Sequence, residues 1–313
     1  MVGGVAGFVG AAVIRPRHGK EKDPGTRADV QKDDHYEELV SKFGDRANVE
    51  DWIAELADDT DFEPNSVPFV VVGTIILWVS WLFFNGGSTV DMFAAREAGI
   101  SKIMMNSIIS GSAGGLVATF LKPWLMGYQN QMTKKGAYDV GSLANGLLAG
   151  LVAITGVCDA AEPWGALIIG FIGGIVYSLS CKLCDIITVD DPIEASSVHG
   201  FTGMWGLIAV GIFHTENGLL SGAEEGKLRF FGVQIGGMIV IILWVGVISF
   251  LYFASMHFFK LLRVSILDEV IGLDIAEMGG LLHINKAVND KIARANSLRN
   301  SQSLRVPDGQ TKA

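Results

Sequence analysis

The sequence predicts an all-α membrane protein, a polytopic bundle of helices. Half of its 313 residues are hydrophobic, 18% are charged and 39 are glycine. With a mean hydropathy of +0.38, this composition is too apolar and too rich in glycine for an ordinary soluble domain. Long apolar segments also recur along the chain, several of them near the roughly 20 residues that a helix needs to cross a bilayer.

Six apolar segments follow one another after residue 66. All but the fifth approach or exceed the length that spans a bilayer. Pro68, Pro163 and Pro192 stand near segment starts, where a missing amide donor costs little. Glycine and serine recur inside the segments, and such small residues let helix backbones approach closely in lipid. The segments cover residues 67–87, 103–121, 138–157, 163–183, 197–214 and 232–260.

The first apolar run, residues 1–14, is uncharged and is followed by Arg15 and Arg17. It is too short to cross a bilayer alone, and it lacks the basic region that precedes the apolar core of a signal peptide. We therefore expect a truncated transmembrane helix, the second half of one whose first half is missing. A short signal-anchor or a re-entrant segment is the alternative.

The distribution of charge predicts the topology. The formal net charge of −9 comes mostly from residues 23–65, which argues against a nucleic acid as partner. Basic residues gather in alternate connections, on the side of Arg15 and Arg17, which the positive-inside rule makes cytoplasmic. They are Lys122, Lys134, Lys135, Lys182, Lys260 and Arg263. The predicted organisation is a truncated helix at 1–14, a cytoplasmic loop at 15–66, a six-helix transmembrane domain at 67–260 and a cytoplasmic C-terminal tail at 261–313.

His199 is the first candidate for a functional role. It lies just inside an apolar segment studded with glycine, and an ionisable side chain at membrane depth by default marks a pathway. An apolar wall disfavours imidazolium, and a neutral ring both donates and accepts one hydrogen bond, which suits a small polar solute or a proton relay. A purely structural hydrogen bond is the alternative. Asp190, Asp191 and Glu194 precede this segment, where carboxylates cap a helix and compensate its dipole.

Trp81, Phe84 and Ser88 are the second candidate group. They fall at i, i+3 and i+7, on one face of a helix that approaches the external side. Aromatic rings and a hydroxyl there would hold a small cation by cation–π attraction and one hydrogen bond. An interfacial aromatic belt explains the same pattern equally well.

The sequence offers little sign of an enzyme or of a metal site. Cys158, Cys181 and Cys184 make no disulfide framework, and the single Cys-x-x-Cys lacks a second pair, so we interpret its thiols as incidental. No nucleophile and base have a defensible spacing, and no phosphate-binding loop is visible. We expect no catalytic residue, no cofactor and no metal ligand.

Both candidate groups belong to longer motifs that resemble a known family. The stretches WLFFNGGS at 81–88 and DDPIEASSVHGFTGMWG at 190–206 are similar to signatures of the ammonium transporter family, in its Amt branch. Further matches are NGLLAGLVAIT at 145–155, GALIIG at 165–170, GLDI at 272–275 and the glycine pair at 279–280, so that the resemblance runs from Met1 to about Gly280.

The resemblance implies a fold of eleven transmembrane helices with an inverted repeat, assembled as a trimer with one pore in each subunit. This chain would supply the end of the fifth helix, helices six to eleven and the tail. The family pore holds two adjacent histidines; His199 matches one, and the other would lie before Met1. One gate phenylalanine, one vestibule tryptophan and an aspartate of helix five would also fall in the absent part.

The resemblance also implies roles for individual residues. His199 would serve the pore and its proton relay, and Asn85 would be structural near the pore, together with Asp191 and Glu194. Asp274 matches a tail residue tied to subunit coupling. Met278, where the family often has histidine, and the long 15–66 loop depart from the family pattern. The recruitment face would be Trp81, Phe84 and Ser88.

The implied function is transport of ammonium or ammonia across a membrane. An ammonium ion in an apolar pore loses hydration at great cost, so the family removes a proton, and ammonia and the proton cross separately. We expect a multi-pass protein of the plasma membrane with a cytoplasmic C-terminus, forming homotrimers, or heterotrimers with full-length relatives. The alternative is a non-transporting assembly or ammonium-sensing subunit built from a truncated transporter.

Overall fold

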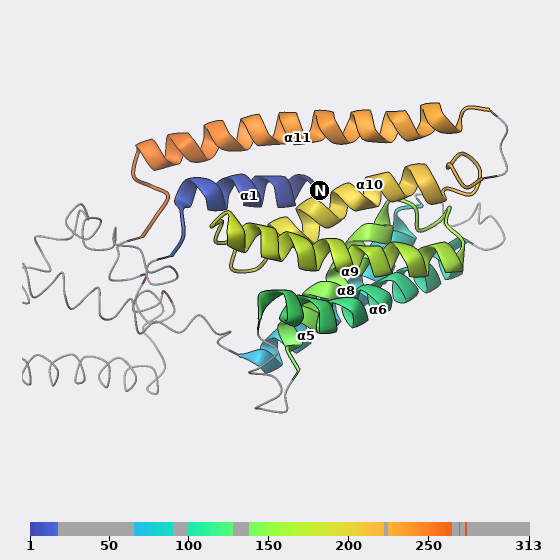
Figure 1. The fold of residues 1–313 in the computed structure, drawn as a ribbon, viewed down its shortest axis with the longest axis horizontal. Helices are drawn as coiled ribbons and strands as arrows, with labels where there is room; N and C mark the ends of the chain where they lie inside the picture. Colours follow the sequence, from blue (N-terminus) through green and yellow to red (C-terminus); the bar gives the residue numbers. More distant parts are fainter. Residues whose placement is uncertain are drawn as a thin grey trace, which may run out of the picture. The chain divides into compact units, whose positions relative to one another are not determined.

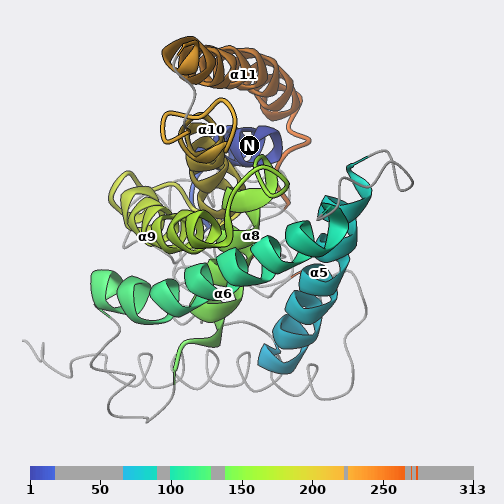
Figure 2. The ribbon, with the colours of Figure 1, turned by 90° about the vertical axis from the view of Figure 1, so that its right-hand side faces the viewer.

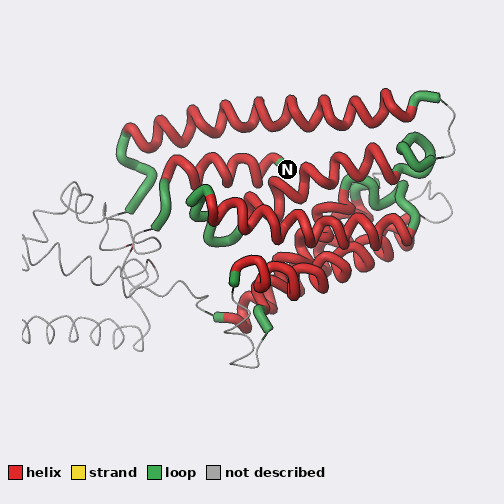
Figure 3. Tube along the Cα trace, in the orientation of Figure 1, coloured by secondary structure: helices red, strands yellow, loops and turns green. Residues whose placement is uncertain are grey.

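The described part of the chain is helical throughout its regular structure, which confirms the all-α prediction (Figure 3). The chain divides into two compact units: Met1–Arg15 with Pro64–Phe258, and Pro16–Glu63 with Phe259–Ala313. Within the second unit, Arg263 donates 2.8 Å hydrogen bonds to the Glu269 carboxylate. The computed structural model describes residues 1–17, 66–89, 99–127, 138–221 and 225–264, together with Glu269 and Leu273.

The first unit contains all the helices that are described below (Figure 1). One of them, η1, is a π-helix that runs directly into the α-helix α10. In chain order the helices are α1 (Val2–Ile14), α5 (Val67–Gly87), α6 (Gly99–Met126), α8 (Val140–Thr155), α9 (Pro163–Ile186), η1 (Ser196–Phe201), α10 (Thr202–Phe213) and α11 (Lys227–Phe258).

Five of the described helical segments are long and apolar enough to span a membrane: α5, α6, α9, η1 with α10, and α11. The protein is therefore an integral membrane protein. The expectation of span-length helices was wrong in two places. The segment at 197–214 qualifies, because η1 and α10 form one continuous helix of 18 residues. The segment at 138–157 does not, because α8 has 16 residues and ends at Thr155, before a tight turn.

Helix starts follow from local side chains. Asp139 caps α8, since its carboxylate accepts hydrogen bonds from the backbone of Gly141 at 3.0 Å and Ser142 at 3.2 Å. Pro163 occupies the first turn of α9, where its missing N–H leaves no partner unsatisfied. Helix α5 begins with both a side-chain cap, from Ser66, and a proline in its first turn, Pro68.

The centre of the bundle is the crossing of α6, α8 and α9 at glycine (Figure 2). A Cβ added to Gly170 would lie 2.1 Å from the Ser110 carbonyl oxygen, and one added to Gly150 would lie 2.2 Å from the same atom. One added to Gly174 would lie 2.7 Å from the Gly114 oxygen. Backbones that approach this closely tolerate no side chain, so these glycines determine how the three helices cross.

The remaining helices lie around this centre. Helix α5 packs on α6 and α8, and α10 packs on α8 and α9, while α11 lies along α1 and α10 (Figure 1). None of the residues of α11 is buried in this structure, and α5 buries only Asn85 and Gly86. Their exposed surfaces are rich in large apolar side chains, as expected for helices that face lipid or further protein.

Gly170→Ala should destabilise the bundle, because the new methyl group would overlap backbone that has no room to move. Overpacking of this kind costs about 1–3 kcal/mol, so the thermal unfolding midpoint of the purified protein in detergent should fall. Gly236→Ala in α11 is the matched control, since a Cβ there meets nothing within 4 Å. Equal midpoints for the two variants would contradict the close crossing.

Candidate functional site

His199 lies in the π-helix η1, which begins at Ser196. The Asp191 carboxylate accepts a 2.6 Å hydrogen bond from the Ser196 amide and a second from its hydroxyl, which satisfies the first turn of η1. At the other end, the Thr202 hydroxyl donates to the Ser197 carbonyl at 2.9 Å. A π-helix of one turn is rare and frequently marks a functional site.

His199 opens into a cavity of about 280 Å³. Trp81 and Phe84 reach this cavity from α5, and Thr155 reaches it from the end of α8, so that residues far apart in the sequence share one space. Most of the remaining lining is small or apolar: Met1, Val152, Gly156, Gly203, Gly206 and Leu207. The cavity therefore suits a small solute that an aromatic ring and an imidazole would contact.

The aromatic rings of the cavity have a defined geometry. The rings of Trp81 and His199 are parallel within 6°, with centroids 6.3 Å apart. Phe84 meets Trp81 edge to face, at 6.1 Å and 70°. The indole N–H of Trp81 donates to the Thr155 hydroxyl at 2.9 Å, and that hydroxyl donates to the Leu151 carbonyl at 2.7 Å. This chain of hydrogen bonds fixes the indole plane against the imidazole.

Ser88 and Asn85 have other surroundings. The Ser88 hydroxyl donates to the Phe84 carbonyl at 2.7 Å, and Ser88 is not among the cavity residues. Asn85 is buried and donates to the Ser107 hydroxyl at 2.9 Å, which joins α5 to α6. Its Oδ1 has no hydrogen-bond partner within the described part of the chain. Of the three proposed recruitment residues, the structure brings Trp81 and Phe84 to His199.

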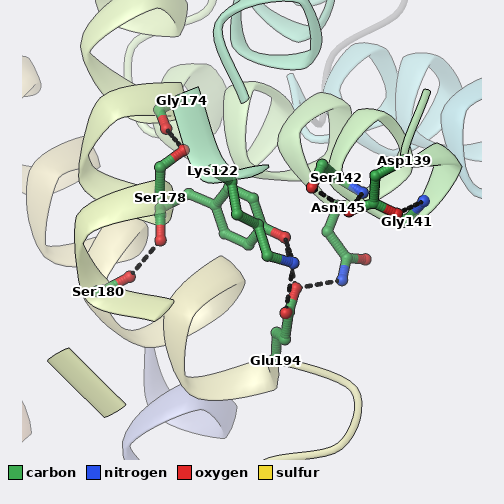
Figure 4. Close-up of polar contacts among 10 residues, drawn as sticks. Lys122, Asp139, Gly141, Ser142, Asn145, Gly174, Ser178, Ser180 and Glu194 are labelled. Carbon is green, nitrogen blue, oxygen red and sulfur yellow. Dashed lines mark hydrogen bonds and ion pairs between the residues drawn. The ribbon is translucent and has the colours of Figure 1, made fainter. Parts of the chain in front are cut away.

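Two of the three carboxylates before His199 contact different neighbours. Asp191 contacts the first residue of η1, as described above, whereas the side chain of Glu194 points into a buried polar network with Lys122, Tyr177 and Asn145 (Figure 4). Sequence reasoning grouped Lys122 with the basic loops, although it is 6% exposed within α6. Its place at the end of an apolar segment, next to Pro123, was the available signal. Asp274 lies outside the described residues.

The cysteines do not form a metal or redox centre in the described ranges. Cys158, Cys181 and Cys184 are all free and buried. Burial, with a smaller contribution from Asp159, raises the pKa of the Cys158 thiol to about 11, which keeps it protonated and unreactive at neutral pH. Among the residues that the structure describes, no three His, Cys, Asp or Glu side chains gather where they could hold a metal ion.

A bundle with five helices long and apolar enough to span a membrane defines a polytopic membrane protein, and this one has a small cavity lined by aromatic rings and a histidine. Comparison with known proteins identifies its family. The model of the Ammonium Transporter Family matches residues 44–281, and the chain belongs to this family. The resemblance found in the sequence motifs is thereby confirmed, and the family consists of transporters, which are not enzymes.

Individual relatives give the same result. The chain is 37% identical over 240 residues to ammonium transporter Amt2 of Archaeoglobus fulgidus, covering 72% of this chain and 49% of that protein. It is 35% identical over 229 residues to ammonium transporter 3 of Dictyostelium discoideum, covering 70% and 51%. The chain thus spans about half the length of the curated relatives that it matches.

Solved structures share the fold. One titled "Sensor Amt Protein" superposes with a TM-score of 0.64 at 27% identity, covering 88% of this chain and 57% of that one. Mep2 of Saccharomyces cerevisiae superposes with a TM-score of 0.59 at 25% identity, covering 84% and 50%. The arrangement of the helices is therefore that of the family.

Thr155→Val should loosen the indole of Trp81, because valine keeps the shape of threonine but accepts no hydrogen bond. Leaving a partly buried N–H without a partner costs about 1 kcal/mol, so the unfolding midpoint should fall and the near-ultraviolet circular dichroism of tryptophan should weaken. Thr74→Val is the matched control, since the exposed Thr74 hydroxyl donates to the Val70 carbonyl of its own helix. Identical spectra for wild type and Thr155→Val would contradict the assigned bond.

Proposed function

We propose that this protein takes part in ammonium and ammonia transport, and that the cavity at His199 is part of the path. One observation carries the proposal: Trp81, Phe84 and His199 line a single cavity inside a bundle of this family. Membership of the family supports the substrate class, since Amt2 and its relatives are named as ammonium transporters.

The aromatic end of the cavity would recruit the cation. Ammonium over the face of an indole gains cation–π attraction, which is larger where water is excluded. Trp81 suits this role because Thr155 holds its N–H, so the ring does not have to be ordered when the ion arrives. Ser88 lies one turn beyond Phe84, and its hydroxyl oxygen still has lone pairs to accept an N–H donor.

The inner end of the cavity would favour the neutral molecule. Its lining of small and apolar residues cannot replace the hydration shell of an ion, whereas ammonia needs little more than one hydrogen bond. The imidazole of His199 offers both a donor and an acceptor, so it would receive a proton or pass one along the path. Deprotonation at the aromatic end and separate passage of ammonia and the proton fit these surroundings.

We propose a trimer in the plasma membrane with residues 15–66 and 261–313 in the cytoplasm. The support is the excess of lysine and arginine in one set of connections and the family to which the chain belongs. In this arrangement residues 1–14 and 67–260 lie in the bilayer, and Asp274 belongs to the tail that would couple subunits.

A second function, ammonium sensing without transport, is favoured by one comparison. The structure titled "Sensor Amt Protein" superposes on 88% of this chain. In this role the same cavity would bind the ion, and the 15–66 loop or the tail would report its occupancy. Flux through the protein separates the two functions, because a sensor binds ammonium without passing it.

His199→Ala should lower methylammonium uptake by about 100-fold or more, the range over which a positioned proton-transfer group acts. Uptake is measured in cells that lack their own ammonium transporters, with the 313-residue chain and with the same chain joined to upstream helices of a relative. Each form is compared with its own His199→Ala variant at equal surface abundance.

If either form conducts and its His199→Ala variant conducts equally, the pore role of His199 is wrong. If neither form conducts but purified protein binds ammonium, the sensing function replaces transport. Conduction by the extended form together with loss in its variant supports the proposal.

Trp81→Leu should raise the KM for methylammonium about fivefold and leave the maximal rate nearly unchanged, because about 1 kcal/mol of cation–π attraction is lost at the recruitment step. Trp244→Leu is the matched control, since Trp244 is exposed on α11 and does not line the cavity. An unchanged KM in Trp81→Leu would favour an interfacial aromatic belt.

A further inference from the structure

A partly buried ion pair between Lys122 of α6 and Glu194 lies near Asn145 of α8, away from the end of α8 that lines the cavity. The ammonium group of Lys122 is 2.5 Å from one carboxylate oxygen of Glu194 and donates to the Tyr177 hydroxyl at 3.0 Å. The other carboxylate oxygen accepts hydrogen bonds from the Tyr177 hydroxyl and, at 2.8 Å, from Asn145 (Figure 4). Three helices, α6, α8 and α9, thus hold one carboxylate.

This network does not touch the solute cavity. Asn145 stands near the start of α8 and Thr155 at its end, ten residues apart, which corresponds to about 15 Å along a helix. Lys122, Tyr177 and Glu194 are all absent from the cavity lining. The network and the cavity share no residue, so an effect of one on the other passes through the structure between them: the backbone from Glu194 to His199, and the apolar cluster that holds Tyr177 and against which Trp81 packs.

The backbone of Glu194 provides that connection. Its φ of +57° lies in the left-handed region, which glutamate rarely occupies. Its amide donates to the Asp191 carbonyl at 3.0 Å, and its carbonyl accepts the Val198 amide at 2.9 Å. Glu194 therefore ends the turn that begins at Asp191 and accepts the first hydrogen bond of the helix that carries His199.

The helix beyond Glu194 is held on a second side by α1. A Cβ added to Gly4 would lie 1.9 Å from the amide nitrogen of Gly200, so the two backbones are in direct contact next to His199. The π-helix between these two attachments, with its Thr202 hydroxyl bond, is thus held on both sides of the residue that carries the imidazole. A shift at Glu194 would rotate His199 away from Trp81.

We propose that Lys122 and Glu194 are positioning residues, whose ion pair fixes the start of the π-helix and thereby holds the His199 ring parallel to Trp81 in the cavity. The inference rests on the proposed function for its consequence, the passage of a proton or of ammonia at His199. The positioning itself is a property of the folded protein, and it is measured without transport.

The experiment uses ¹⁵N-histidine spectra of the purified 313-residue protein in lipid nanodiscs. The chain contains six histidines, and the His199 signal is assigned by its loss in His199→Gln. The main variant is Lys122→Met with Glu194→Gln, which removes both charges together and leaves no unpaired charge buried. Lys182→Met is the matched control, because Lys182 pairs with Asp185 at 2.9 Å on the exposed surface of α9.

In the double variant we expect the His199 signal to shift or broaden beyond its linewidth while the His214 and His257 signals stay in place. The control should leave all of these signals unchanged, and Lys122→Arg, which keeps the pair, should leave His199 at its wild-type position. A folded double variant with the wild-type His199 signal would overturn the proposal.

Tyr177→Phe keeps the test decisive if the double variant does not fold. It removes one hydroxyl from the network, and a smaller shift of His199 in the same direction is expected. An unchanged His199 signal in folded Tyr177→Phe would then overturn the proposal.

Uptake separates this inference from the proposed function. In a conducting form, the double variant should lose at least about tenfold in maximal rate, with KM held within about twofold, because Trp81 and Phe84 are untouched. A displaced His199 signal with unchanged uptake would leave the positioning role intact and contradict the pore role of His199.

Discussion

The close crossing of three helices at glycine is the constraint on which the rest of the molecule depends. In lipid, the apolar surface of one helix has little to gain from another, so association depends on how closely the backbones approach. Gly150 and Gly170 both contact the Ser110 carbonyl, which locks α8 and α9 onto α6. The position of α8 then determines two distant encounters: Thr155 meets Trp81 at one end, and Asn145 meets Glu194 at the other.

His199 is linked to both encounters: its ring is parallel to Trp81, and its helix starts at Glu194. A π-helix has a wider turn and weaker internal hydrogen bonds than an α-helix, so it persists where the surroundings impose it. Here the surroundings are specific: Asp191 caps its first turn, Thr202 donates within it, and the backbone of Gly4 lies against Gly200. The strained left-handed conformation at Glu194 belongs to the same set, because three hydrogen-bonding side chains hold it in place.

The sequence alone predicted the fold class, the apolar segments and the family, because each rests on composition, length or local motifs. It placed Trp81, Phe84 and His199 as candidates without predicting that they share a cavity, since helical periodicity says nothing about which helices meet. Lys122 was assigned to a loop because charge counting cannot detect a buried partner 72 residues away. The span at α8 was overestimated, because hydropathy continues past Thr155 where the backbone turns. The π-helix could not be predicted, since its hydrogen bonds depend on neighbours supplied by other helices.

The pairing of Glu194 with Lys122 also bears on what the cavity binds. An unpaired carboxylate inside a membrane protein is costly and attracts any cation that comes near. In the proposed function, an unpaired Glu194, five residues before His199, would compete with Trp81 for ammonium. The ammonium group of Lys122, 2.5 Å from that carboxylate, offsets its charge. In the proposed function, Glu194 can therefore organise the start of the helix while the cavity beside His199 stays suited to a neutral molecule.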